Sequence, residues 1–154
     1  MENLILKEGL QAPNFTLIGS DKKEHTLSDY LNKKVILYFY PKDNTAACSQ
    51  EAQDFKNSMK EFNEKDTIII GISRDSIKSH DKFIAKYDLP FLLLSDEEEV
   101  VCNLYGVLKE KTMFGKKYLG IERSTFVINE EGLITNIYRK VKVSGHVETL
   151  KCSI

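Results

Sequence analysis

The sequence predicts an α/β domain of three layers, with a mixed central sheet between helices. Two apolar runs, at 34–40 and 67–72, are typical of strands that are buried on both faces. Segments with apolar residues at helical spacing lie between and after these runs. Two further strand patterns, at 124–128 and 134–138, flank a turn signal and predict an antiparallel hairpin. The length of 154 residues fits one domain, 1–154, with a core of its own.

The strand predictions rest on residue type and on the residues that end each run. The run at 34–40 is rich in β-branched and aromatic residues, and Pro41 ends it because proline lacks a backbone N–H. The run at 67–72 is of the same kind. Residues 129–132, Asn-Glu-Glu-Gly, supply the turn between the last two strands.

Four helices are predicted, at 45–62, 76–87, 96–105 and from near Ser144 to Cys152. In the first, apolar residues repeat at spacings of three and four: Ala52, Phe55, Met59 and Phe62. Ser76 is suited to cap the second helix. The acidic start of the third complements the helix dipole, and Gly106 ends it. The four acidic residues at 96–99 predict no metal site, because consecutive helical positions point in different directions.

The order of elements is strand, helix, strand, helix, helix, hairpin, helix. Two parallel units followed by an antiparallel hairpin describe an α/β domain whose sheet is mixed. A thioredoxin-like architecture has this order, and we expect that fold.

Composition and charge exclude several function classes. Hydrophobic residues make up 42% and charged residues 29%, which is ordinary for a soluble globular protein. The formal net charge is −1, and no basic stripe stands out, so we expect no nucleic-acid or anionic-membrane partner. No run of about 18 apolar residues occurs, which predicts no membrane span. The partner is expected to be a small molecule or another protein.

The cysteines and the first residues indicate a reducing compartment. The apolar run at 4–6 is shorter than the core of a signal peptide and lies between Glu2 and Glu8. The three cysteines are an odd number and stand far apart, at positions 48, 102 and 152. This spacing is not a secreted disulfide framework and suits free thiols, so we expect the cytoplasm.

The chemically informative residue is Cys48. It stands where a buried strand gives way to a helix, in the expected first turn. Helix N-termini leave N–H groups unpaired and favour anions, so the reactive thiolate is stabilised there. Thr45 lies three residues earlier, an offset that lets its hydroxyl approach the sulfur or a molecule bound beside it. Pro41 shapes and shields the loop.

These residues resemble a known family. Pro41-x-x-x-Thr45-x-x-Cys48 is similar to the active-site motif of the peroxiredoxins, and 41–45, Pro-Lys-Asp-Asn-Thr, is the wording of their bacterioferritin comigratory (Q-type) branch. The resemblance covers almost the whole chain. Further matching segments occur in the family's order, at 12–17, 71–76, 89–91, 94–96, 105–107 and 115–126.

The resemblance implies roles for several residues. Cys48 would be the peroxidatic cysteine, and Thr45 would form a hydrogen bond with the peroxide oxygen. Arg123 would hold the thiolate and the peroxide, and Pro41 would exclude solvent. These roles agree with the chemistry, because attack of the thiolate moves negative charge onto the leaving oxygen of the peroxide and prearranged donors stabilise that charge. Glu51 matches a position where the family often has an acid that orients the arginine, although a solvated helix glutamate is an equal alternative.

The chain departs from the family pattern in two places. Ala46 and Ala47 replace the usual Pro-Gly, which stiffens the loop. The family's usual positions for a resolving cysteine correspond to Gln53 and Ile84, and neither is a cysteine. Two other cysteines remain as candidates, Cys102 and Cys152. We interpret Cys102 as a semi-buried core thiol and Cys152 as a tail thiol, with a resolving role left open for both.

The resemblance implies reduction of hydrogen peroxide and small alkyl hydroperoxides through a Cys48 sulfenic acid, without cofactor or metal. We expect a one-cysteine cycle, with thioredoxin or a low-molecular-weight thiol as reductant. An atypical two-cysteine cycle through Cys102 or Cys152 is the alternative, and a peroxide sensor that relays oxidation to a partner is another. A monomer is expected, with a dimer possible.

The histidines offer no rival site. His25, His80 and His146 are isolated and lack metal-ligand spacing. We expect His80 and His146 to lie at exposed helix starts.

Overall fold

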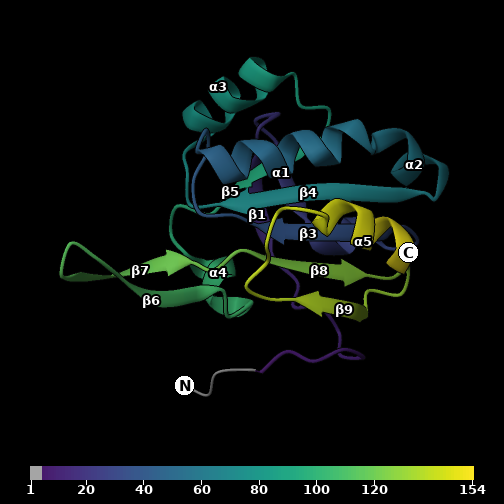
Figure 1. Ribbon diagram of the computed structural model, residues 1–154. Coiled ribbons are helices and arrows are strands. Elements are labelled where there is room, and N and C mark those ends of the chain that lie inside the picture. The colour runs from purple at the N-terminus through teal and green to yellow at the C-terminus, as the bar shows by residue number, and fades with distance from the viewer. Residues whose placement is uncertain (1–4) are drawn as a thin grey trace.

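The computed structural model describes residues 5–154, so residues 1–4 of the expected domain 1–154 lie outside the described residues. It confirms the α/β class with a mixed central sheet (Figure 1). The sheet contains β1 (Thr16–Gly19), β2 (Glu24–Thr26), β3 (Lys34–Phe39), β4 (Thr67–Ser73), β5 (Leu92–Ser95), β8 (Ser124–Ile128) and β9 (Ile134–Tyr138). Its strand order is β2-β1-β5-β4-β3-β8-β9. Strands β3, β4 and β5 run parallel, so their carboxyl ends meet at one edge.

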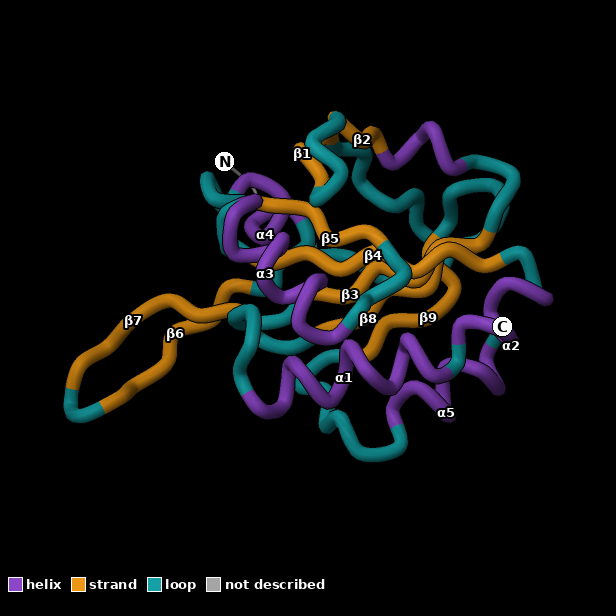
Figure 2. Tube along the Cα trace, turned by 90° about the horizontal axis from the view of Figure 1, so that it is seen from above, coloured by secondary structure: helices purple, strands orange, loops and turns teal. Residues whose placement is uncertain are grey.

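Helices cover both faces of the sheet. They are α1 (Ala46–Asn57), α2 (Met59–Glu64), α3 (Ile77–Tyr87), α4 (Val100–Leu104) and α5 (His146–Ser153), with a 3-10 helix at Leu27–Tyr30. Helices α1, α2, α3 and α5 pack on the face that presents Ile36, Tyr38 and Val127. Helix α4 and the first segment of the chain pack on the opposite face, over Leu37 and Phe126. Figure 2 shows α1 and α5 side by side on the first face.

The strongest sequence patterns gave accurate boundaries. The strands at 124–128 and 134–138 are confirmed and pair antiparallel. The strand predicted at 34–40 ends at Phe39, and the one at 67–72 extends to Ser73. The hydroxyl of Ser76 accepts the N–H of Ser79, which confirms the predicted cap of α3. The last helix begins at His146, close to the predicted Ser144.

Two predicted helices differ from the structure. The helix predicted at 45–62 is broken at Ser58, whose ψ of 7° leaves the helical range and separates α1 from α2. The helix predicted at 96–105 contains only α4. Its acidic start lies in a turn, because the Asp96 carboxylate accepts the N–H groups of Val101 and Cys102 and Glu99 has a φ of 64°. A residue in the left-handed region cannot continue a helix backward.

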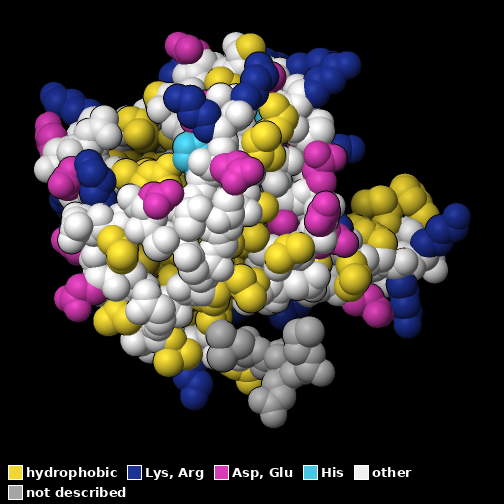
Figure 3. Space-filling model, turned by 180° about the vertical axis from the view of Figure 1, so that it is seen from behind, with side chains coloured by type: hydrophobic (Ala, Val, Ile, Leu, Met, Phe, Trp, Pro, Cys, Tyr) yellow, Lys and Arg dark blue, Asp and Glu magenta, His cyan; other side chains and the backbone are white. Residues whose placement is uncertain are grey.

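A two-stranded hairpin, β6 (Leu108–Met113) and β7 (Lys116–Ile121), projects from the body and was not predicted. Most of its residues are exposed, and Phe114 at its turn is 96% exposed. Figure 3 shows hydrophobic and basic side chains together on this hairpin. A strand with both faces in water has no alternation of apolar and polar residues to reveal it. Across residues 5–154, no helix is long and apolar enough to cross a membrane.

Candidate active site

Cys48 occupies the first turn of α1, at the sheet edge where β3 ends. Thr45 is the N-cap residue with an extended backbone, and its carbonyl accepts the N–H of Ser49. The first turn therefore forms immediately after the loop that leaves β3. The Cys48 side chain packs with Tyr38 and Phe55 and is 2% exposed. Cys48 thus lies in the first turn of a helix, where free backbone N–H groups favour negative charge.

Arg123 reaches the same point from the start of β8, which pairs with the end of β3. It stands between β7 and β8, and its Nη2 donates toward the Sγ of Cys48 at 3.4 Å. Its Nη1 donates to Oε1 of Glu51 at 2.8 Å. Burial disfavours the guanidinium charge, but Glu51 and Cys48 outweigh it and raise the pKa of Arg123. The arginine therefore stays charged while it contacts the sulfur.

Glu51 lies one turn after Cys48 and is fully buried, so the alternative of a solvated helix glutamate does not hold. Burial raises the pKa of Glu51 to about 7, and the ion pair with Arg123 only partly opposes this. Its second oxygen, Oε2, has no hydrogen-bond partner among the described residues, and neither does the hydroxyl of Tyr38. The acid orients the arginine through one oxygen only.

Thr45 does not contact the sulfur by a hydrogen bond in this structure. Its Oγ1 donates to the carbonyl oxygen of Lys42 at 2.9 Å. The hydroxyl hydrogen is thus committed to the loop, and the lone pairs of Oγ1 remain available to an incoming donor. Pro41 follows β3 and is half-buried, and Asn44 has a φ of 62°, which turns the loop toward α1.

The two other cysteines do not join this site. Cys102 is fully buried on the opposite face of the sheet, in the cluster that contains Tyr105 and Phe126. Burial, together with the neighbouring Asp96, raises the pKa of the Cys102 thiol. It is therefore more deeply buried than the semi-buried thiol that the sequence predicted, and it is held in the protonated form.

Cys152 is exposed on α5, at the end of the layer remote from the first turn of α1. The ammonium of Lys65, just after α2, donates to the carbonyl oxygens of Lys151 and Ile154. The end of α5 therefore lies beside the end of α2. Cys48 lies at the far end of α1, a helix about 18 Å long at 1.5 Å per residue. All three cysteines are free.

Two histidines expected at exposed helix starts are buried instead. His80 is fully buried and its Nδ1 lies 2.7 Å from Oδ2 of Asp43. His146 is 7% exposed and pairs with the hydroxyl of Thr125 at 2.8 Å. Burial and the charge of Arg123 lower the pKa of His146 to about 4, so it is neutral. The expectation was wrong because polar helix starts look alike in sequence whether they face water or another element.

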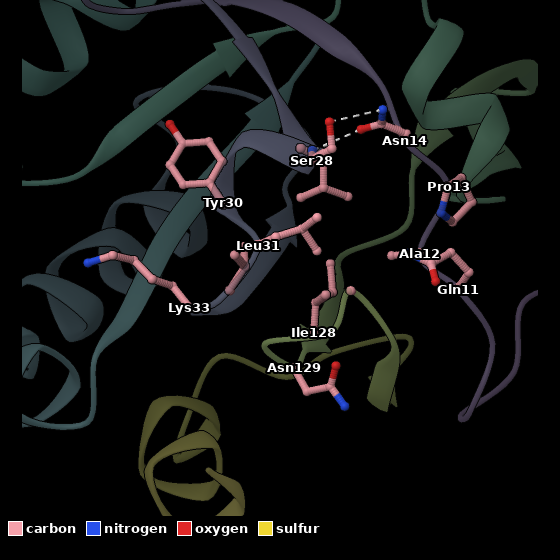
Figure 4. Close-up of a pocket in the computed structure, with 13 residues that line it drawn as sticks. Gln11, Ala12, Pro13, Asn14, Ser28, Tyr30, Leu31, Lys33, Ile128 and Asn129 are labelled. Atoms are coloured by element: carbon pink, nitrogen blue, oxygen red, sulfur yellow. Dashed lines mark hydrogen bonds between the residues drawn. The ribbon is translucent and has the colours of Figure 1, made fainter.

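One hollow on the surface lies away from Cys48. It has a volume of about 320 Å³ and lies at the edge where β3 begins and β8 ends, beside Val35 and Ile128 (Figure 4). Asn14 and Ser28 are hydrogen-bonded to each other at its wall. The peroxide chemistry expected at Cys48 belongs to the opposite edge of the sheet. Within residues 5–154, no group of three or more His, Cys, Asp or Glu residues could hold a metal ion.

Known proteins are similar to this chain in sequence and in fold. Residues 9–137 match the model of the AhpC/TSA family. The chain is 49% identical to a protein named putative peroxiredoxin bcp from Coxiella burnetii, over 92% of this chain and 94% of that protein. It is 47% identical to peroxiredoxin Bcp from Bacillus subtilis, over 96% of this chain and 97% of that protein.

A solved structure of the bacterioferritin comigratory protein from Xanthomonas campestris, described for its alkyl peroxide reduction activity, superimposes with a TM-score of 0.86. It is 42% identical over 90% of this chain and 88% of that one. This similarity confirms the thioredoxin-like fold. The chain belongs to the AhpC/TSA family, within the bacterioferritin comigratory (Q-type) peroxiredoxins, and is a thiol peroxidase.

Proposed function

We propose that this peroxiredoxin reduces hydrogen peroxide and small alkyl hydroperoxides with Cys48 as the peroxidatic residue. The observation that carries the proposal is the guanidinium of Arg123, which lies 3.4 Å from the Cys48 sulfur and is fixed by the buried Glu51. The alkyl peroxide reduction described for the Xanthomonas campestris relative supports the substrate class.

In the proposed reaction the Cys48 thiolate attacks one peroxide oxygen. The S–O bond forms as the O–O bond breaks, the hydroxyl stays on sulfur as sulfenic acid, and the leaving oxygen takes a proton to become water or an alcohol. Arg123 lies where negative charge passes from the sulfur to the leaving oxygen, and it stabilises that charge without having to move.

We assign Thr45 the task of holding the peroxide. Its hydroxyl hydrogen is donated to the Lys42 carbonyl, so Oγ1 would accept the O–H of the peroxide and orient the oxygen toward sulfur. Pro41 would limit the access of water where β3 ends. Cys48, Thr45, Arg123 and Glu51 come from one chain, so a monomer carries a complete site.

The cycle we propose uses one cysteine of this chain. Cys102 lies behind the sheet and Cys152 lies at the remote end of α5, so neither is near the sulfenic acid. Two thiol groups of an outside reductant would then convert the sulfenic acid to the thiol and release water, with a disulfide formed on the reductant. Thioredoxin or a low-molecular-weight thiol fits this need, and the cytoplasm keeps such thiols reduced.

The test is the intact mass of the reduced protein after one equivalent of hydrogen peroxide, measured without reductant. The proposal predicts a monomer that carries one added oxygen, which a sulfenic-acid reagent traps at Cys48. Cys48→Ser should lose both the added oxygen and peroxide turnover. Persistent turnover in Cys48→Ser would reject the assignment. A protein lighter by two hydrogens, or a covalent dimer, would reject the one-cysteine cycle and identify Cys102 or Cys152 by mapping the bond.

A further inference from the structure

A buried network of polar side chains lies beneath the loop that carries Thr45. Its centre is the carboxylate of Asp43, which is 2% exposed. Oδ1 accepts the hydroxyl of Tyr40 at 2.5 Å, and Oδ2 accepts the hydroxyl of Ser79 at 2.8 Å and contacts Nδ1 of His80 at 2.7 Å. A buried charge with this many donors is held in one geometry, because each lost donor would leave it unpaired.

The partners of His80 define its protonation. Nδ1 faces the Asp43 carboxylate, and Nε2 faces the carbonyl oxygen of Leu94 at 2.9 Å. A carboxylate and a carbonyl only accept hydrogen bonds, so both ring nitrogens must carry hydrogen. The His80 side chain is fully buried, so its two ring nitrogens depend on these two partners. His80 is therefore an imidazolium that forms a buried ion pair with Asp43.

Asp43, Asp75 and Tyr40 are charged or titratable groups that face His80. Asp43 contacts His80 from the loop, and Asp75 lies near His80 in the segment between β4 and α3. The hydroxyl of Tyr40, the residue after β3, lies 3.5 Å from Nδ1 of His80. Burial alone would lower the pKa of His80, but Asp43, the Leu94 carbonyl and Asp75 outweigh it and raise that pKa.

The network fixes the loop at two points. The backbone N–H of Asp43 donates to Oδ2 of Asp75 at 2.7 Å, and the same oxygen accepts the hydroxyl of Ser73 at the end of β4. Asp43 lies two residues before Thr45 and five before Cys48, and its carboxylate forms its hydrogen bonds with Tyr40, Ser79 and His80 instead. Whatever it contributes to the chemistry, it contributes through the position of the loop.

We propose that His80 is a positioning residue for the peroxide reaction: its ion pair with Asp43 fixes the 41–45 loop and so fixes Thr45, the N-cap of the helix that carries Cys48. This inference rests on the proposed function, since it concerns the same Cys48. Neutral His80 would have one N–H for two acceptors, and either Asp43 or the Leu94 carbonyl would lose its donor. The raised pKa means that the pair is complete below pH about 6.5 and is lost as pH rises through the value in the folded protein.

The experiment compares two reactions of Cys48 in variants of His80. Oxidation by hydrogen peroxide needs Thr45 in place, whereas alkylation by iodoacetamide needs only an accessible, ionised sulfur. His80→Leu should slow the peroxide reaction by about 100-fold and the alkylation by less than about threefold. His80→Asn, whose amide N–H replaces Nδ1–H, should recover most of the peroxide rate. The matched control is His25→Asn, which changes another Asp–His pair, on β2, a strand separated from β3 by three others.

Nitrogen NMR of the wild-type protein provides the second measurement, and it does not depend on any variant folding. At pH 6 both ring nitrogens of His80 should be protonated, and on titration upward the loss of one proton should coincide with a fall in the peroxide rate that His80→Asn lacks.

A single protonated nitrogen at pH 6, or equal slowing of both Cys48 reactions in His80→Leu, would overturn the proposal. If the proposed function itself were wrong, the wild type would react with iodoacetamide and not with peroxide.

Discussion

Arg123 connects Cys48 to Glu51: one guanidinium nitrogen lies 3.4 Å from the sulfur and another lies 2.8 Å from the carboxylate. Both contacts use the planar fork of arginine, which a lysine ammonium cannot reproduce. The acid that fixes the arginine is itself buried on the helix that carries the cysteine. Sulfur, guanidinium and carboxylate are thereby held in one arrangement by two elements distant in sequence.

Arg123→Lys should keep a positive charge near the sulfur and lose the fork. We expect the rate constant of Cys48 oxidation by hydrogen peroxide to fall by about 100-fold, the usual cost of removing one prearranged donor. Rapid-mixing measurements under single-turnover conditions check this. The matched control is Arg139→Lys, because Arg139 also donates to two acceptors, the carbonyls of Tyr105 and Gly106, on the other face of the sheet. Equal rates in both variants would contradict the role of Arg123.

Thr45→Val should remove the oxygen that we propose orients the peroxide and leave the shape of the side chain almost unchanged. The peroxide rate constant is expected to fall by about 100-fold, while Thr45→Ser should retain most of it. Thr149→Val is the control, since Thr149 also donates its hydroxyl to a backbone carbonyl, on α5. A Thr45→Val protein as fast as the wild type would show that the peroxide is oriented without this hydroxyl.

Glu51 should titrate near neutral pH. Burial raises its pKa from 4.5 to about 7, so carbon NMR of its carboxyl group should report a midpoint near that value. An acid whose folded pKa is raised stabilises the protein below the unfolded pKa and loses that contribution as pH rises through the folded value. The wild type should therefore lose stability relative to Glu51→Gln between pH 4.5 and 7, by up to about 3 kcal/mol. Denaturant titrations across this range measure it, and a constant difference would contradict the shift.

How far the sequence reveals this molecule depends on how much of an element faces the core. The strand at 124–128 is fully buried and the strand at 134–138 is partly buried, and both were located to the residue. Ser76 identified the start of α3 because a cap is a local interaction between neighbours in the chain. The β6–β7 hairpin, exposed on both faces, carried no such signal.

The residues of the candidate site likewise divide into those that the sequence predicted and those that it did not. Cys48 and Thr45 belong to one short motif, and the resemblance supplied Arg123 and Glu51, which the structure brings together with the sulfur. His80 was misjudged, because its burial depends on a contact with Asp43 that lies 37 residues away in the chain. Local sequence patterns depend on the neighbours of a residue in the chain. Asp43 and His80 meet only through tertiary packing, which such patterns do not reveal. Asp43 itself had no signal beyond its place in the loop.

The thiols other than Cys48 should differ sharply in reactivity. In a Cys48→Ser background, Cys152 should react at once with a disulfide reagent, while Cys102, fully buried and with a raised pKa, should react only after unfolding. Cys102→Ala should cost about 1–2 kcal/mol of unfolding free energy because it leaves a small cavity, whereas Cys152→Ala should cost less than about 0.5.

Peroxide turnover with an outside thiol should survive when both Cys102 and Cys152 are replaced by alanine in a protein that keeps Cys48. The sheet separates Cys102 from the sulfenic acid and the length of α1 separates Cys152 from it, so neither thiol can reach it without local unfolding. Steady-state assays with thioredoxin and with a small dithiol measure this. A loss of turnover in the double variant, restored when either cysteine is returned, would mean that the first turn of α1 unwinds far enough to meet a second thiol of this chain.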